Sequence, residues 1–182
     1  MARLPYVDPA TAPDAVRDLL SRLPVPLNVF RMMAHSEHGF RPLVGLGTAI
    51  LGRQKLDARL RELVILRVAR LSPARYEWVQ HVPIAEAVGA SAAEVAALER
   101  DDIEADCFGP LERLVLRFAT EVVRDVRASD ATFSALAARL SPQEIVEVIL
   151  TVGYYMMIAR LLETTAVDLD PAVGTRVVDA LR

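Results

Sequence analysis

The stretch from Leu56 to Leu71 constrains the fold most, because its apolar side chains recur at steps of three and four residues. That spacing is typical of a helix that buries one face; the apolar positions are Leu56, Leu60, Leu63, Val64, Val68 and Leu71. Ser72 and Pro73 follow at once, a favourable N-cap and a residue suited to the first helical position. We therefore expect a tight turn and a second helix that runs to about Val88, where a glycine follows.

The rest of the chain has the same helical spacing, and no alternation of useful length indicates a strand. "SAAE" at 91–94 is a capping box, and "SPQE" at 141–144 repeats the Ser-Pro start. We expect a single all-α domain over 1–182, with an extended arm at 1–13. The tail after Val167 is expected to fold onto the body or onto a neighbouring subunit. The other expected helices lie at about 14–23, from 28 to a break at Gly39 to Pro42, from there to 51, and at 91 onward, 111–126, 129–140 and 141–163.

Composition and charge exclude several classes of protein. Hydrophobic residues make up 53% and charged residues 25%, which fits a compact chain and argues against disorder. The net charge is -3 with acids and bases interspersed, so no nucleic-acid partner is expected. The N-terminus "MARLPYVDPATAP" has no apolar signal segment, and the run "VEVILTVGYYMMIA" is shorter than a membrane span and contains Glu147. We expect a cytoplasmic protein with no membrane partner.

The segment "SPARYEWVQH" at 72–81 carries the candidate chemistry. Glu77 and His81 are four residues apart, so they share one helix face. A carboxylate at that spacing can hold an imidazole in one tautomer and raise its basicity. Glu62 lies on the preceding helix, and the tight turn can bring it across to face this pair. Two carboxylates and a histidine would form a proton-transfer site.

The same segment also has an ordinary interpretation. A glutamate and a histidine at four-residue spacing are common on surface helices, and the short pattern has low specificity. Tyr76 and Trp78 either line a pocket or belong to the core or to a subunit interface.

Other motifs predict neither a metal site nor a cofactor. "HSEH" at 35–38 places His35 and His38 three apart, but no further histidine is near, so a surface pair at a helix end is the better interpretation. "GLGTAILG" at 45–52 follows no strand and lacks the spacing of a phosphate-binding loop. "GYYMMIAR" at 153–160 is expected in the core or at a subunit interface.

Several segments resemble the carboxymuconolactone decarboxylase family, which includes alkyl hydroperoxidase D. They are "RLRELVILRVARLSPARYEWVQHVPIAEAVGASAAEVAAL", the upstream "LNVFRMMAHS" and the downstream "GYYMMIARLLETTAV". The resemblance covers about residues 25–168. It implies an all-helical fold built round a helical hairpin and assembly as homo-trimers or homo-hexamers that bind a small-molecule substrate.

The family's peroxidase branch carries Cys-x-x-Cys-x-x-x-His, with a glutamate twelve residues before the first cysteine. In this chain the glutamate corresponds to Glu62 and the histidine to His81, whereas Ala74 and Glu77 stand at the two cysteine positions. Dithiol peroxide reduction needs a thiolate and a resolving thiol. The one cysteine, Cys107, is distant along the chain and has no partner. The chain therefore resembles the branch that lacks the cysteine pair.

The decarboxylase branch also lacks these thiols, and its reaction removes a carboxylate from a small unsaturated lactone acid. Loss of CO2 leaves a dienolate, which a site must stabilise and then protonate on carbon. The resemblance implies that His81, held by Glu77, is this acid, and that Glu62 orients the histidine or relays its proton.

Substrate binding is expected from neighbours of this trio. A cation should hold the leaving carboxylate, and Arg75, Arg61 and Arg53 are the nearby candidates. Arg75, Tyr76 and Trp78 are the expected substrate-binding residues. Two alternatives stay open: a peroxidase of the hydroperoxidase D type, which the missing thiols disfavour, and a non-catalytic oligomeric protein that binds a small molecule.

Overall fold

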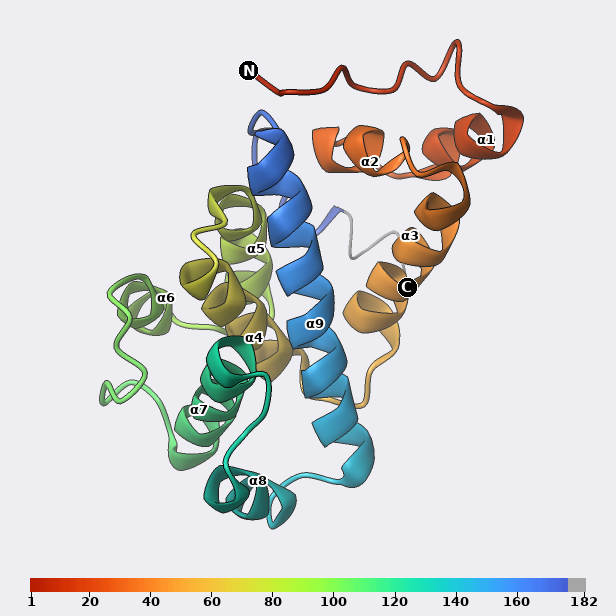
Figure 1. Cartoon of the computed structure of the whole chain (residues 1–182). Coiled ribbons are helices and arrows are strands. Elements are labelled where there is room, and N and C mark those ends of the chain that lie inside the picture. Colours follow the sequence, from red (N-terminus) through yellow and green to blue (C-terminus); the bar gives the residue numbers. More distant parts are fainter. Residues whose placement is uncertain (177–182) are drawn as a thin grey trace.

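The structure is a computed structural model that describes residues 1–176. Within this range the chain forms nine helices and no strand (Figure 1). The helices are α1 (Asp14–Arg22), α2 (Asn28–Met33), α3 (Glu37–Arg53), α4 (Ala58–Leu71), α5 (Arg75–Ala87), α6 (Ala92–Glu99), α7 (Pro110–Asp125), α8 (Asp130–Ala137) and α9 (Pro142–Thr165). The predicted all-α fold class is confirmed.

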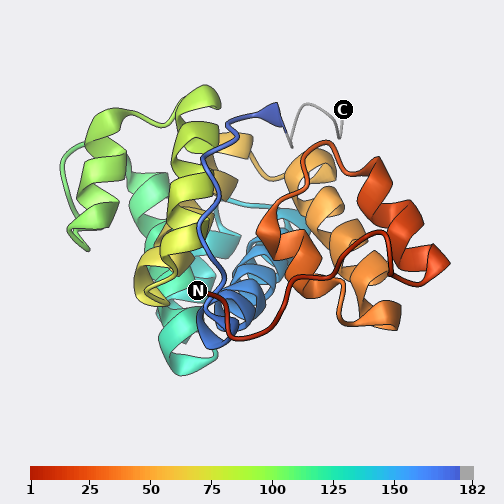
Figure 2. The same ribbon diagram turned by 90° about the horizontal axis from the view of Figure 1, so that it is seen from above.

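The long helix α9 lies between two groups of helices. Helices α1 to α3 lie on one side of it and α4 to α8 on the other, as the two views show (Figures 1 and 2). Helix α4 packs against α5, α7 and α9, and every residue from Leu60 to Ala69 is buried. Charged residues of α4 are therefore enclosed by protein and must find partners there.

The predicted helical hairpin is present as α4 and α5, but its turn lies later than expected. The Ser72 N–H donates to the Val68 carbonyl at 2.9 Å, and the Ala74 N–H donates to the Ala69 carbonyl at 2.9 Å. These bonds extend the end of α4, so Ser72 terminates α4 and Ala74 precedes the first residue of α5, Arg75. The prediction that Ser72 caps the second helix is wrong, because its backbone already belongs to the first.

The break expected at Gly39 to Pro42 is also wrong in position. Helix α2 ends at Met33 and α3 begins at Glu37, so the chain turns between these two residues and Pro42 lies inside α3. Pro42 and His38 are both exposed. The carbonyl that loses its N–H partner at the proline can be hydrated, which lets the helix continue.

The starts of α6 and α9 follow local sequence signals. Ser91 and Ser141 each accept a bond from the backbone N–H three residues later, and Glu94 and Glu144 accept from the serine N–H groups at 2.8 Å. Both are complete capping boxes, which satisfy N–H groups that a helix start leaves free.

The N-terminal arm and the segment that follows α9 lie close to each other. Asp168, beyond α9, accepts hydrogen bonds from Tyr6 Oη at 3.0 Å and from the Ala2 N–H at 3.3 Å, which fastens the N-terminal arm. Further on, the Asp170 carboxylate accepts from the Asn28 N–H at the start of α2 at 2.7 Å and from the Tyr76 hydroxyl on α5. The described part of the tail therefore folds onto the body, the first of the two expected arrangements, while residues 177–182 lie outside the described residues.

Helix α9 is the one described helix with the length and hydropathy of a membrane span. Half of its most apolar window is buried inside the protein, which is what the central helix of a helical bundle requires.

Candidate active site

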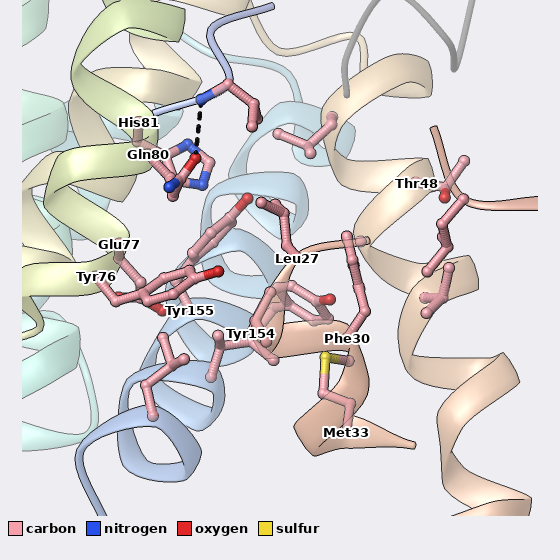
Figure 3. A pocket seen from close by; sticks show the side chains of 18 of the residues that line it. Leu27, Phe30, Met33, Thr48, Tyr76, Glu77, Gln80, His81, Tyr154 and Tyr155 are labelled. Atoms are coloured by element: carbon pink, nitrogen blue, oxygen red, sulfur yellow. Dashed lines mark hydrogen bonds between the residues drawn. The ribbon is translucent and has the colours of Figure 1, made fainter. Parts of the chain in front are cut away.

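A cavity of about 120 Å³ lies between α2, α3, α5 and α9 (Figure 3). The tail closes one side of it through Val173. Most of the wall is aliphatic or aromatic, including Leu27, which precedes α2, and Phe30 and Met33 from α2. The polar side chains that line it are Thr48, Tyr76, Glu77, Gln80, His81, Tyr154 and Tyr155.

Glu62 and His81 form a buried hydrogen-bonded pair across the hairpin. Glu62, on α4, has an exposed fraction of 0%, and its Oε2 lies 2.8 Å from Nδ1 of His81 on α5. Nε and Nη2 of Arg61 donate to the other oxygen, Oε1, at 3.1 and 3.0 Å. The ring of Tyr155 packs edge-to-face against the imidazole of His81, with 4.9 Å between the two ring centroids. The carboxylate therefore fixes the ring through Nδ1 and leaves Nε2 as its second proton-exchanging atom.

The partner of His81 is thus Glu62, whereas the sequence analysis assigned the holding role to Glu77. Helical spacing places Glu77 and His81 on one face of α5, but side chains from the packed neighbour α4 approach the imidazole more directly. Glu77 instead lines the cavity on the same side as His81 (Figure 3).

Glu77 is a buried carboxyl without a partner. Its exposed fraction is 3%, and neither carboxyl oxygen has a hydrogen-bond partner among the described residues. Burial raises the pKa of Glu77 well above its usual value, and the negative charge of Glu163 raises it further. The neutral, protonated form of the carboxyl is favoured, so Glu77 can donate a hydrogen bond inside the cavity.

Two tyrosines of α9 complete this wall. Burial raises the pKa of Tyr154 to about 12, with a smaller contribution from Glu77. The pKa of Tyr155 is raised well above its usual value, first by burial and then by Glu62. Both hydroxyls therefore keep their protons at neutral pH, and that of Tyr154 donates to the Leu43 carbonyl at 3.2 Å.

The arginines predicted from the sequence lie outside the cavity. Among the described residues, the cavity is lined by no lysine or arginine. Arg61 is engaged by Glu62, and Arg53 is exposed at the end of α3. Arg75 is exposed as well and lines, together with Trp78, a separate shallow hollow. The structure thus brings Glu62, Glu77, His81 and Tyr76 together, and it places Arg75 and Trp78 elsewhere.

Gln80 is a functional candidate that the sequence analysis missed. It lines the cavity, and its Nε2 donates to the carbonyls of Asp170 and Pro171 at 3.0 and 3.2 Å, while its Oε1 accepts from the Val173 N–H at 3.3 Å (Figure 3). Together with Tyr76, one turn earlier, it holds the tail over the cavity. The four-residue spacing was visible in the sequence, but the partner segment was not.

The histidines of "HSEH" and Cys107 do not line the cavity. Nε2 of His35 lies 2.7 Å from the Pro5 carbonyl, and both histidines of "HSEH" are exposed. In the described part of the chain, no group of three or more histidine, cysteine, aspartate or glutamate side chains is arranged to hold a metal ion. Cys107 packs against a second apolar cluster that includes Leu98 and Phe108, away from the cavity.

A sequence model of the carboxymuconolactone decarboxylase family matches residues 39–121, which include the hairpin and both residues of the Glu62–His81 pair. Over these residues the chain is similar to the carboxymuconolactone decarboxylase family. It lacks the cysteine pair of the peroxidase branch, since Ala74 and Glu77 occupy those positions. No curated protein matches the chain.

Several solved structures share the fold. The core of an alkylhydroperoxidase D, an uncharacterized peroxidase-related protein from Ralstonia eutropha JMP134, is 20% identical, with a TM-score of 0.79, over 93% of this chain and 92% of that one. A peroxidase-related protein from Silicibacter sp. TM1040 is 17% identical, with a TM-score of 0.77, over 100% and 96%. A variant of the debrominase Bmp8 in complex with 2,3,4-tribromopyrrole is 16% identical, with a TM-score of 0.76, over the whole of both chains. At these identities the likeness is one of fold.

Proposed function

We propose that the protein is an enzyme that transfers protons on a small carbonyl compound, such as a lactone or an oxo acid, with His81 as the proton carrier. The observation that carries this proposal is the 2.8 Å contact between Nδ1 of His81 and Oε2 of the buried Glu62 at the cavity wall. A histidine fixed in this way presents one defined nitrogen to a bound molecule.

The proposed reaction uses the two nitrogens of the ring differently. Nδ1 donates to the Glu62 carboxylate, so the lone pair is on Nε2. Nε2 removes a proton from the carbon next to the substrate carbonyl, and the C–H electron pair moves into the carbonyl as an enolate. The imidazolium that forms is stabilised by Glu62. Return of the proton to the same or another carbon restores the neutral ring.

Glu77 is suited to stabilise the enolate. Its protonated carboxyl can donate a hydrogen bond to the oxygen on which negative charge develops, in a site with a largely apolar wall. Decarboxylation of a lactone acid is a second form of the same chemistry: departure of CO2 generates the dienolate, and doubly protonated His81 delivers the proton to carbon. Both forms require the same three residues.

Deuterium exchange tests the proposal. The protein is incubated in D2O with a panel of small ketones and lactones, and loss of the α-proton signals is followed by NMR. We expect exchange with the wild type, little with His81→Ala, and a reduced rate with Glu62→Gln. Exchange at the wild-type rate in His81→Ala would disprove the assigned role of the histidine.

The two alternatives predict different results. A dithiol peroxidase needs two neighbouring thiols, and Cys107 is the one cysteine of the chain. A non-catalytic binding protein would bind members of the panel without exchanging their protons, so binding without exchange would favour that alternative.

Assembly into a homo-oligomer stays a prediction. Val146, Ile149, Leu150 and Met157 are exposed apolar side chains on one face of α9, and such a face is a plausible contact surface for a second copy. Light scattering on the wild type and on Ile149→Glu would test it: a shift of the variant to a smaller mass supports this face, and a wild-type monomer refutes the prediction.

A further inference from the structure

The charge of the cavity wall restricts what the cavity can bind. The two carboxyl groups at or behind the wall belong to Glu77 and Glu62. The guanidinium nearest to them, that of Arg61, directs Nε and Nη2 to Oε1 of Glu62 and is itself almost fully buried. Among the described residues, the wall therefore offers an incoming anion two acids and no free cation.

Moving an anion from water into this cavity costs a large desolvation free energy. A carboxylate that enters an apolar cavity loses its water, and the loss is offset only where a cation or several donors replace that water. Here the donors are a histidine engaged by Glu62, the carboxyl of Glu77 and tyrosine hydroxyls, of which that of Tyr154 already bonds to Leu43. Glu77 gives an internal example, since its own burial without partners disfavours its charged form.

The volume restricts the ligand further. An engineered cavity of roughly 150 Å³ in another protein admits benzene, and the cavity of about 120 Å³ found here is of that order. Phe30, Met33 and Leu27 provide an apolar wall for a ring.

We propose that the site takes an uncharged, largely apolar carbonyl compound built on one small ring, and that it discriminates against carboxylates. This inference rests on the proposed function, because it assumes that the cavity beside His81 is the reactive site. It narrows the proposed substrates to uncharged lactones and ketones, and it disfavours the oxo acids and lactone acids, for which the predicted arginines would have been needed at the wall.

Three probes of similar size and different charge test the inference. Acetophenone and benzoate have the same ring and the same number of non-hydrogen atoms, and benzylammonium provides the cation. Binding to the full-length wild type is measured at neutral pH by isothermal titration calorimetry and by ligand-observed NMR. We expect acetophenone to bind about 100-fold more tightly than benzoate, in line with the cost of burying an unpaired charge.

A matched pair of variants checks that the wall charge is the cause. Thr48, half-buried on α3, lies across the cavity from the α5 side chains (Figure 3). Thr48→Lys adds a cation there, and Thr48→Met adds a side chain of similar length without charge. We expect the lysine variant to bind benzoate at least about 10-fold more tightly than the methionine variant does. Circular dichroism and the melting temperature confirm that both variants fold.

The outcomes separate this inference from the proposed function. Benzoate binding as tightly as acetophenone overturns the inference, as does absence of binding by all three probes. Tightest binding by benzylammonium also overturns it and indicates a cation site set by Glu77. If acetophenone binds preferentially but its methyl protons never exchange with D2O, the preference stands and the proposed proton transfer fails.

Discussion

Helix α4 presents charged side chains on two sides. The two sides differ in how completely their charged and polar groups are paired. Toward α6 and α7, Arg67 bonds to Asp101 and, at 2.9 Å, to the hydroxyl of Thr120. In the same region Arg59 bonds to Glu94 and, at 2.9 Å, to Glu112. Each guanidinium has two partners, and each partner is near enough for a charge-assisted bond.

Toward α5 the polar groups are incompletely paired. Glu62 is bonded at both oxygens, but Nε2 of His81 has no partner among the described residues, and Glu77 has none at either oxygen. Buried groups of this kind cost stability, so they are retained where they have another role. The comparison teaches that the charged groups on the α6 and α7 side are paired as a structural contact requires, while the unpaired groups on the α5 side are those that the proposed function uses.

The largest effect is expected from His81→Ala. Removal of the proton carrier should lower the exchange rate of the folded protein by about 1000-fold, the usual range for a general acid or base. It also leaves Oε2 of the buried Glu62 without its partner, so a loss of stability is expected that His81→Asn should reduce. The exchange assay in D2O and differential scanning calorimetry provide the two measurements. His81→Asn, which keeps a donor for Glu62, is the control. A loss of stability as large as the loss of rate would mean that this side is structural too.

On the opposite side, Glu94→Ala should destabilise the protein by about 3 kcal/mol and leave the exchange rate of the folded protein unchanged. The substitution removes the capping box of α6 and one buried partner of Arg59. Urea denaturation measures the loss. Glu94→Gln, which keeps a side-chain acceptor for the Ser91 N–H, should lose less. A slower exchange reaction in folded Glu94→Ala would erase the distinction between the two sides.

Glu77→Gln tests the cost of the unpaired carboxyl. Because the folded-state pKa is raised, the folded protein binds this proton more tightly than the unfolded chain does. Stability should fall as pH rises above about 4.5, by at most about 1.4 kcal/mol per pH unit, until the folded pKa is passed. The variant should lack this decline. Urea denaturation at pH 5, 6, 7 and 8 gives the comparison, and parallel curves would contradict the prediction.

The smallest effect is expected from Tyr76→Phe. The change removes the hydroxyl that bonds to Asp170 and costs about 1 kcal/mol. It should loosen the tail over the cavity and speed ligand release. NMR line shapes of bound acetophenone report the release rate, and Tyr6→Phe, which weakens the tail away from the cavity, is the control. Equal release rates in wild type and Tyr76→Phe would show that the tail does not restrict entry.

The helices could be predicted because their signals are local. The apolar spacing of α4 and the capping boxes at Ser91 and Ser141 act within a few residues of chain, so they do not depend on the final packing. The errors at Ser72 and Pro42 have the same origin: each residue had a plausible local role as a start or a break. Bonding from the preceding helix decided the first case, and the exposed position of Pro42 inside α3 allows the second.

The sequence by itself determined that the fold is helical and that Glu62 and His81 lie on neighbouring helices of a hairpin, since helical periodicity and turn position control both. Only the tertiary structure decided that Glu62, and not Glu77, holds the imidazole, that Arg75 lies outside the cavity, and that Gln80 fastens the tail. Spacing along one helix says which side chains share a face. Which of them meets a partner depends on how distant segments pack, because those contacts join residues far apart in the chain.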